Sequence, residues 1–172
     1  MDLFDKIERT RHFGELFLLW LWYQSAKNET VFYLSDQSML ELTIGDQIAF
    51  EARLTQTEKT VLSGGAPAES REAFEALKQG KAVSQAKIVL MREEKTWQFT
   101  LQSATLAISG LKIPALMTKA DDEKLFERQA LIEEVDSLIR GLYESFLNAR
   151  LSDGWHEEEK QIIQWIDDNA KE

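Results

Sequence analysis

Residues 121–151 read DDEKLFERQALIEEVDSLIRGLYESFLNARL, and this stretch decides the fold class. Apolar residues recur in it at seven-residue intervals: Leu125, Ile132, Ile139 and Phe146, then Leu131 and Leu138, then Val135 and Leu142. This spacing predicts one long amphipathic helix with a wide apolar stripe. Asp121 and Asp122 stand at its start, where the helix dipole favours negative charge.

Two further helices are predicted near the ends of the chain. Residues 12–27 are apolar on most of the helix circumference and rich in aromatic side chains, which indicates a helix buried on several sides. Residues 1–11 are read as a lead-in to that helix. Residues 152–172 are read as a C-terminal helical extension, with a helix at about 155–170.

The middle of the chain changes to a period of two, which is typical of strands. We expect strands at 31–34, 39–44, 48–54, 60–62, 82–92, 96–102 and 105–108. A turn is expected at Gly45 and Asp46, a hairpin tip at residues 93–95, and the end of the sheet at Ser109 and Gly110. A helix at 68–79 should end at Gly80. The sequence therefore predicts one α+β domain over residues 1–172. In it, an antiparallel sheet packs with the aromatic N-terminal helix and the long C-terminal amphipathic helix.

Composition excludes several classes of function. The chain of 172 residues has no cysteine and two histidines, so neither disulfides nor cysteine-built zinc sites can form. His12 with Glu15 and His156 with Glu159 have metal-ligand spacing, but such pairs arise by chance among 30 acidic residues. No phosphate-binding loop or nucleophile motif is present. We therefore expect a non-enzymatic protein without metal or cofactor.

Location follows from the same composition. The longest apolar run, residues 16–23, is too short to cross a membrane, and the acidic start is unlike a signal peptide. The expected location is the cytoplasm.

The net charge of −10 hides an uneven distribution. Residues 51–119 hold ten basic and seven acidic residues, whereas residues 120–172 hold six and fifteen. Five cations lie close together in the basic part and are the candidate phosphate contacts: Lys78, Lys81, Lys87, Arg92 and Lys95. On an extended strand, Lys81, Val83, Gln85 and Lys87 share parity and are expected on one face. The alternative is that these five cations are ordinary surface charges that keep the protein soluble.

Three stretches together resemble the family of the recombination-associated protein RdgC, over about residues 12–151. The first is LKQGKAV at 77–83, followed by spaced apolar residues at 90, 99, 101, 106, 108 and 111. The second is the acidic pair at 121–122 followed by Leu125 and Phe126, Leu131 and Ile132, and Glu134. The third is FGELFLLWLW at 13–22, which is similar to an aromatic helix of divergent members.

The resemblance implies a protein that binds double-stranded DNA without sequence preference and restrains recombinases, acting as a homodimer at the nucleoid. It implies that Lys81, next to Gly80, contacts phosphate; local charge adds Lys78, Lys87, Arg92 and Lys95. The chain departs from the family in lacking the N-terminal domain and in being strongly acidic. The alternative is therefore an acidic protein-interaction module of the same fold that has lost DNA binding. The homodimer should bury part of the helix at 12–27 or of the helix at 121–151.

Overall fold

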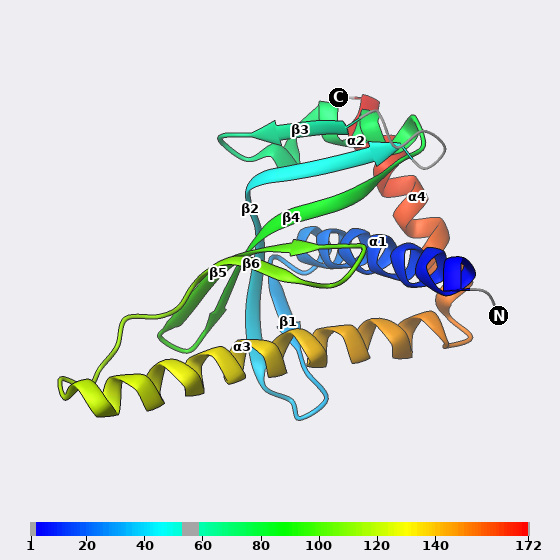
Figure 1. Cartoon of the computed structure of the whole chain (residues 1–172). Helices are drawn as coiled ribbons and strands as arrows, with labels where there is room; N and C mark the ends of the chain where they lie inside the picture. Colours follow the sequence, from blue (N-terminus) through cyan, green and yellow to red (C-terminus); the bar gives the residue numbers. More distant parts are fainter. Residues whose placement is uncertain (1–2, 53–58, 172) are drawn as a thin grey trace.

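The computed structural model describes residues 3–52 and 59–171 and has an α+β fold, as predicted. Figure 1 shows its elements, which are α1 (Leu3–Lys27), β1 (Val31–Tyr33), β2 (Met39–Ala52), β3 (Lys59–Ser63), the 3₁₀ turn η1 (Pro67–Glu69), α2 (Arg71–Lys78), β4 (Lys81–Arg92), β5 (Lys95–Gln102), β6 (Ile108–Lys112), α3 (Asp121–Arg150) and α4 (Trp155–Lys171). The strands form one antiparallel sheet in the order β1-β2-β4-β5-β6, with β3 pairing to β2.

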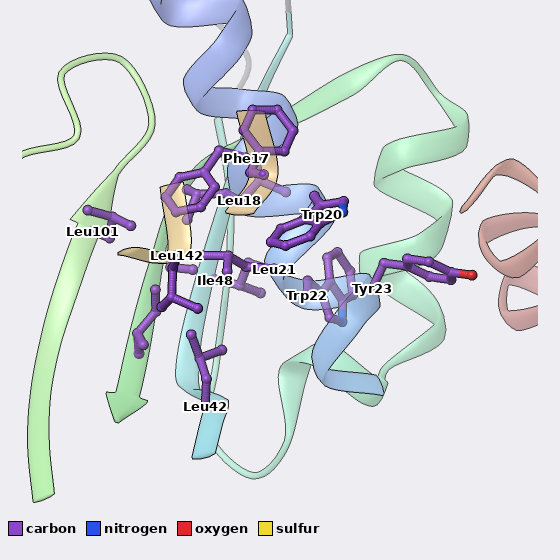
Figure 2. Packing of buried hydrophobic residues seen from close by; sticks show 14 of the residues in the cluster. Phe17, Leu18, Trp20, Leu21, Trp22, Tyr23, Leu42, Ile48, Leu101 and Leu142 are labelled. Atoms are coloured by element: carbon purple, nitrogen blue, oxygen red, sulfur yellow. The ribbon is translucent and has the colours of Figure 1, made fainter. Parts of the chain in front are cut away.

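The aromatic helix α1 lies in the core. Its buried side chains Phe17, Leu18 and Leu21 pack within the core, whereas Tyr23 points away toward α4 (Figure 2). Phe17 is fully buried and packs against Phe146 of α3, with the rings tilted and their centroids 5.6 Å apart. The expected lead-in at residues 1–11 is wrong from Leu3 onward, because α1 already begins there. Residues 3–11 contain neither proline nor glycine, so nothing in them prevents a helix.

Helix α3 has the predicted bounds within one residue, and its apolar stripe is buried over its second half. The buried side chains are Leu131, Val135, Leu138, Ile139, Leu142 and Phe146. The indole N–H of Trp97, a fully buried residue of β5, donates a hydrogen bond of 3.0 Å to the main-chain carbonyl of Leu131. The sheet therefore holds α3 from Leu131 onward.

The predicted turn at Gly45 and Asp46 is wrong, because both residues lie inside the continuous strand β2. Ile44 pairs with Ile88 of β4 and Ile48 pairs with Ala86, so three residues of β2 face the single residue Lys87. Such a bulge bends a strand without ending it. A methyl group at Gly45 would lie 3.3 Å from the Lys87 main-chain oxygen, so the two strands stay close here.

The last strand is also displaced from its predicted position at 105–108. Ser109 and Gly110 were expected to close the sheet but lie inside β6, which pairs Ile108 with Leu101 and Lys112 with Gln98. Gly110 has a φ of 60°, and the pairing of β5 with β6 is irregular at this point. Glycine adopts this backbone without strain, so the strand continues past it.

Candidate functional site

The five candidate cations are strung along β4 and its two ends instead of forming one patch. Lys78 and Lys81 lie where α2 meets β4, Lys87 lies in the middle of β4, and Arg92 and Lys95 lie at the hairpin with β5. A strand of 12 residues reaches about 40 Å when extended. The five cations therefore lie in different surroundings.

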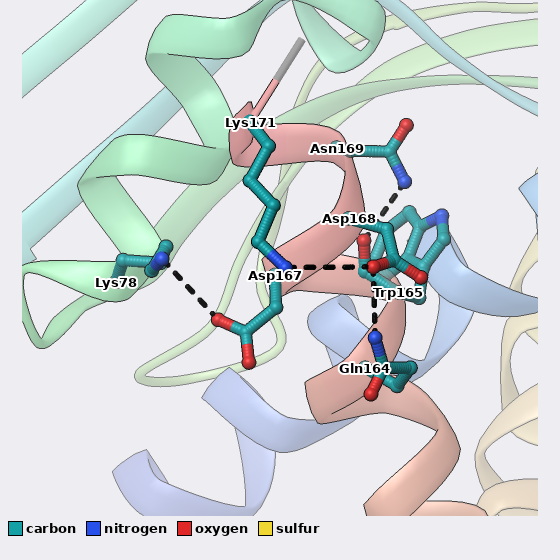
Figure 3. Close-up of polar contacts among 7 residues, drawn as sticks. All are labelled: Lys78, Gln164, Trp165, Asp167, Asp168, Asn169 and Lys171. Atoms are coloured by element: carbon teal, nitrogen blue, oxygen red, sulfur yellow. Dashed lines mark hydrogen bonds and ion pairs between the residues drawn. The ribbon is translucent and has the colours of Figure 1, made fainter.

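Lys78 faces the C-terminal helix. Its Nζ lies 3.4 Å from Oδ1 of Asp167 in α4 (Figure 3). Both side chains are partly exposed, so this is a surface ion pair that links α2 to α4. A phosphate at Lys78 would have to compete with Asp167.

Lys81, the first choice from the family resemblance, lies where the sheet meets the helices. Its Nζ donates a hydrogen bond of 2.9 Å to Oγ1 of Thr60 in β3. It lines a small cavity of about 150 Å³ together with the buried Glu15 of α1, Leu77 of α2 and Ile166 of α4. Lys81 is therefore half-buried beneath three helices and not displayed on an open strand.

Lys87 lies on the other side of the sheet. Its Nζ is 2.8 Å from Oδ1 of Asp46, within the bulge of β2. The hydrogen bond from Lys87 lowers the pKa of Asp46 below its usual value, and the charges of Lys87 and then Lys112 act in the same direction. The Lys87 side chain is 28% exposed and that of Asp46 is 58% exposed, so solvent reaches the pair.

Arg92 and Lys95 lie at the far hairpin, close to acidic groups. The Nζ of Lys95 donates a hydrogen bond of 2.9 Å to Oε2 of Glu134 in α3. The pKa of Asp36 is lowered chiefly by the hydroxyl and main-chain N–H of Ser38, and the charge of Arg92 contributes. Lys95 thus links the hairpin to α3 and has a structural role.

The expectation that Lys81, Val83, Gln85 and Lys87 share one face is wrong. Gln85 pairs with Ala49 of β2, but the next pair joins Val83 with Phe50, so Ser84 is an extra residue in β4. This bulge reverses the alternation. Val83 joins the core with Ala86, whereas Lys87 points to the opposite face.

That opposite face of the sheet, here called the open face, carries Lys87, Val89 and Met91 of β4, Thr96, Gln98 and Thr100 of β5, and Lys112 of β6. Its side chains are exposed or half-buried, and they alternate with the buried residues of the same strands. Lys112 did not stand out in the sequence, because its membership of this face follows from the pairing with Gln98.

Basic and acidic residues are distributed unevenly between the strands and the helices α3 and α4. The described strands hold six lysine or arginine residues and three acidic ones, whereas α3 and α4 hold six and thirteen. The sheet is therefore the basic part of an acidic protein. An anionic partner meets less repulsion at the open face than at the long helices.

One large cavity among the described residues shows no catalytic arrangement. It measures about 700 Å³ and lies between α1, β1 and α3, lined by Trp20, Phe32 and Tyr33. Of its lining residues, Gln24 accepts a hydrogen bond from Asn28 and donates one to Glu158 of α4, and Ser145 donates to the main-chain carbonyl of Gly141. Within residues 3–52 and 59–171, no cluster of three potential metal ligands is found.

Sequence periodicity also missed a group of exposed apolar side chains at the start of α3. Leu125 is 64% exposed, Phe126 is 72% exposed and Ile132 is 44% exposed. Leu125 and Ile132 belong to the predicted stripe, part of which was expected to be buried in a homodimer. The stripe runs past the point where the sheet ends, and periodicity carries no signal of that limit (Figure 1).

No protein-family model matches the chain, and no curated protein matches it significantly in sequence. Among the helices of the described residues, none combines the length and apolar character needed to cross a membrane.

Proposed function

We propose that this protein is a non-enzymatic binding protein that contacts the backbone of double-stranded DNA through the open face of its sheet. The observation that carries the proposal is the division of charge, because the described strands are net basic whereas α3 and α4 are net acidic. Two of the six strand cations, Lys87 and Lys112, lie on the open face. The resemblance to the RdgC family supports it and adds a role in recombination control, with a place at the nucleoid.

The chemistry of the open face suits contact without sequence readout. Lysine, threonine and glutamine side chains are common donors to phosphate oxygens, and the face offers all three. Lys87 and Lys112 flank Asp46, so a phosphate can replace this exposed carboxylate as the partner of Lys87. Of the five phosphate contacts expected from the sequence, Lys87 is the one that lies on the open face. Lys112 is a second lysine on that face.

The test is a salt titration of binding to a fluorescent duplex of about 30 base pairs, followed by anisotropy. Binding should weaken steeply as salt rises. Replacing Lys87 and Lys112 together by glutamine should weaken binding and reduce the salt slope by about 2. The matched control is Lys78→Gln with Lys95→Gln, which removes the same charge from cations held by Asp167 and Glu134. Equal losses in both double variants would contradict the open face, and no binding at low salt would contradict the function.

A second candidate function is an acidic protein-interaction module of this fold. The exposed apolar residues of α3 favour it, because apolar groups rimmed by charge on a surface mark binding sites. The test is affinity capture from a nuclease-treated lysate. A partner that still co-purifies supports this function, and loss of every partner after nuclease treatment contradicts it.

A further inference from the structure

We propose that the first turns of α3, residues 121–136, are a docking site for a basic amphipathic helix of a partner protein. This proposal deepens the second candidate function and does not depend on DNA binding. The segment is about 24 Å long. Its exposed apolar side chains are Leu125, Phe126 and Ile132, and the apolar Met117, 87% exposed, lies just before the helix.

The exposure results from the length of the helix. α3 is 30 residues long, and its contact with the core begins at Leu131, below Trp97 of the sheet. Figure 1 shows the start of α3 projecting beyond the hairpin of β4 and β5. Leu125 and Ile132 are seven residues apart and share one side of the helix, while Phe126 lies about 100° further round on the adjacent side.

The projecting start of α3 is nevertheless held in place. The Glu127 carboxylate accepts hydrogen bonds from the main-chain N–H groups of Met117 and Thr118, at 2.5 and 3.0 Å, and from the Thr118 hydroxyl at 2.7 Å. These bonds lower the pKa of Glu127 below its usual value. The apolar side chains are thus presented on a prepared surface, which reduces the ordering cost of binding.

The charge around these side chains selects the partner. Residues 121–136 hold seven acidic residues and two basic ones. Asp122 stands one turn before Phe126 and Glu133 two turns after it, so both flank Phe126 on the same side of the helix. The ion pair of Lys124 with Asp121, at 3.1 Å, uses one of the two cations.

A groove of about 570 Å³ lies between α3 and the β4–β5 hairpin, with Pro114, Ala115 and Leu131 among its apolar lining. Glu93, Glu94 and Lys95 of the hairpin also line it. Because Leu131 faces the core, this groove lies on a different side of α3 from Leu125 and Phe126.

The negative charge of this surface distinguishes between three possible occupants, which are a second copy of the chain, DNA and a basic helix. A second copy of the chain that docked through this same surface would bring matching acidic charge, and DNA would bring phosphates, so both are repelled. A helix with apolar residues at positions i, i+4 and i+7 and lysine or arginine between them complements the surface in both respects. The partner is therefore basic and amphipathic.

The probe is a synthetic peptide of about 18 residues, with leucines on one helical face and lysines on the other. A matched peptide has glutamate in place of each lysine. Binding to the full chain is measured by fluorescence anisotropy. The lysine peptide should bind and the glutamate peptide should not. The double variant Leu125→Ser with Phe126→Ser should weaken binding of the lysine peptide about tenfold or more.

The matched control is Leu151→Ser with Ile163→Ser, which changes two apolar residues that are 82% and 55% exposed, next to and within the acidic α4. This control should bind the lysine peptide within about twofold of the parent chain. An equal loss in both double variants, or no loss in the first, would overturn the docking site. A drop in the mass of the free protein caused by the first variant would assign the surface to a second copy. The variant Lys87→Gln with Lys112→Gln should keep peptide binding, which separates this site from the proposed DNA surface.

Discussion

Gly14 of α1 lies directly against the main-chain carbonyl of Ser103, in the turn after β5. A methyl group at Gly14 would be 1.7 Å from that oxygen, far inside van der Waals contact. Ser103 cannot easily withdraw, because its N–H and its hydroxyl both bind the carbonyl of Ser84, at 2.9 and 3.0 Å. We therefore expect Gly14→Ala to destabilise the fold by about 1–3 kcal/mol or more, measured by denaturant unfolding.

The matched control for this substitution is Gly141→Ala in α3. A methyl group there would meet the flexible end of Leu34 at 3.4 Å, an ordinary contact. Alanine is also the better helix former by about 1 kcal/mol, so this variant should be as stable as the parent chain or more stable. Equal effects of the two variants would contradict the close packing of Gly14.

The apolar stripe of α3 should divide into a half that stabilises the fold and a half that does not. Leu138 is 2% exposed within the core, and its replacement by alanine should cost about 2–5 kcal/mol of unfolding free energy. Leu125 is 64% exposed, and Leu125→Ala should stay within about 0.5 kcal/mol of the parent chain. A large loss in Leu125→Ala would show that the start of α3 is covered in the protein alone.

This division shows what sequence periodicity predicts and what it does not. Seven-residue spacing placed α3 within one residue of its bounds, because a helix of that length follows from local pattern alone. The pattern does not say how far the sheet extends beneath the helix. That depends on Trp97 and Leu131, which are 34 residues apart in the chain.

The irregularities of the strands show the same limit of sequence patterns. Alternation found β4 and β5 almost to the residue. It failed at Ser84, where one extra residue reverses which side chains face the core. The sequence also carried no sign of the acidic partners of Lys78 and Lys95, which come from the distant helices α4 and α3. Local charge counts cannot include such partners.

Low pH should break the hydrogen bonds that the Glu127 carboxylate accepts from Met117 and Thr118, here called the Glu127 clamp. Hydrogen bonds to the charged carboxylate lower its pKa in the folded protein below the ordinary value of 4.5. The stabilisation is therefore complete above that ordinary value and is lost as pH falls through the lowered folded value. Glu127→Gln should be less stable than the parent chain at pH 7, and the difference should disappear in acid.

Denaturant midpoints of both proteins between neutral pH and about pH 2 provide the measurement for this prediction. Glu123→Gln is a suitable control, since Glu123 is an exposed acid in the first turn of the same helix. A difference between Glu127→Gln and the parent chain that stays constant down to the lowest pH would contradict the clamp.

The oligomeric state tests the dimer that the family resemblance implies. Of the two faces expected from the sequence, the apolar face of α1 is covered within the chain, since Phe17, Leu18 and Leu21 are at most 1% exposed. The exposed start of α3 is acidic and repels a second copy. A dimer must therefore use another surface, and light scattering should give twice the 19.8 kDa of one chain. Because that surface is separate, Leu125→Ser with Phe126→Ser should leave the mass unchanged. A mass of one chain at micromolar concentration would contradict the dimer and weaken the resemblance from which it comes.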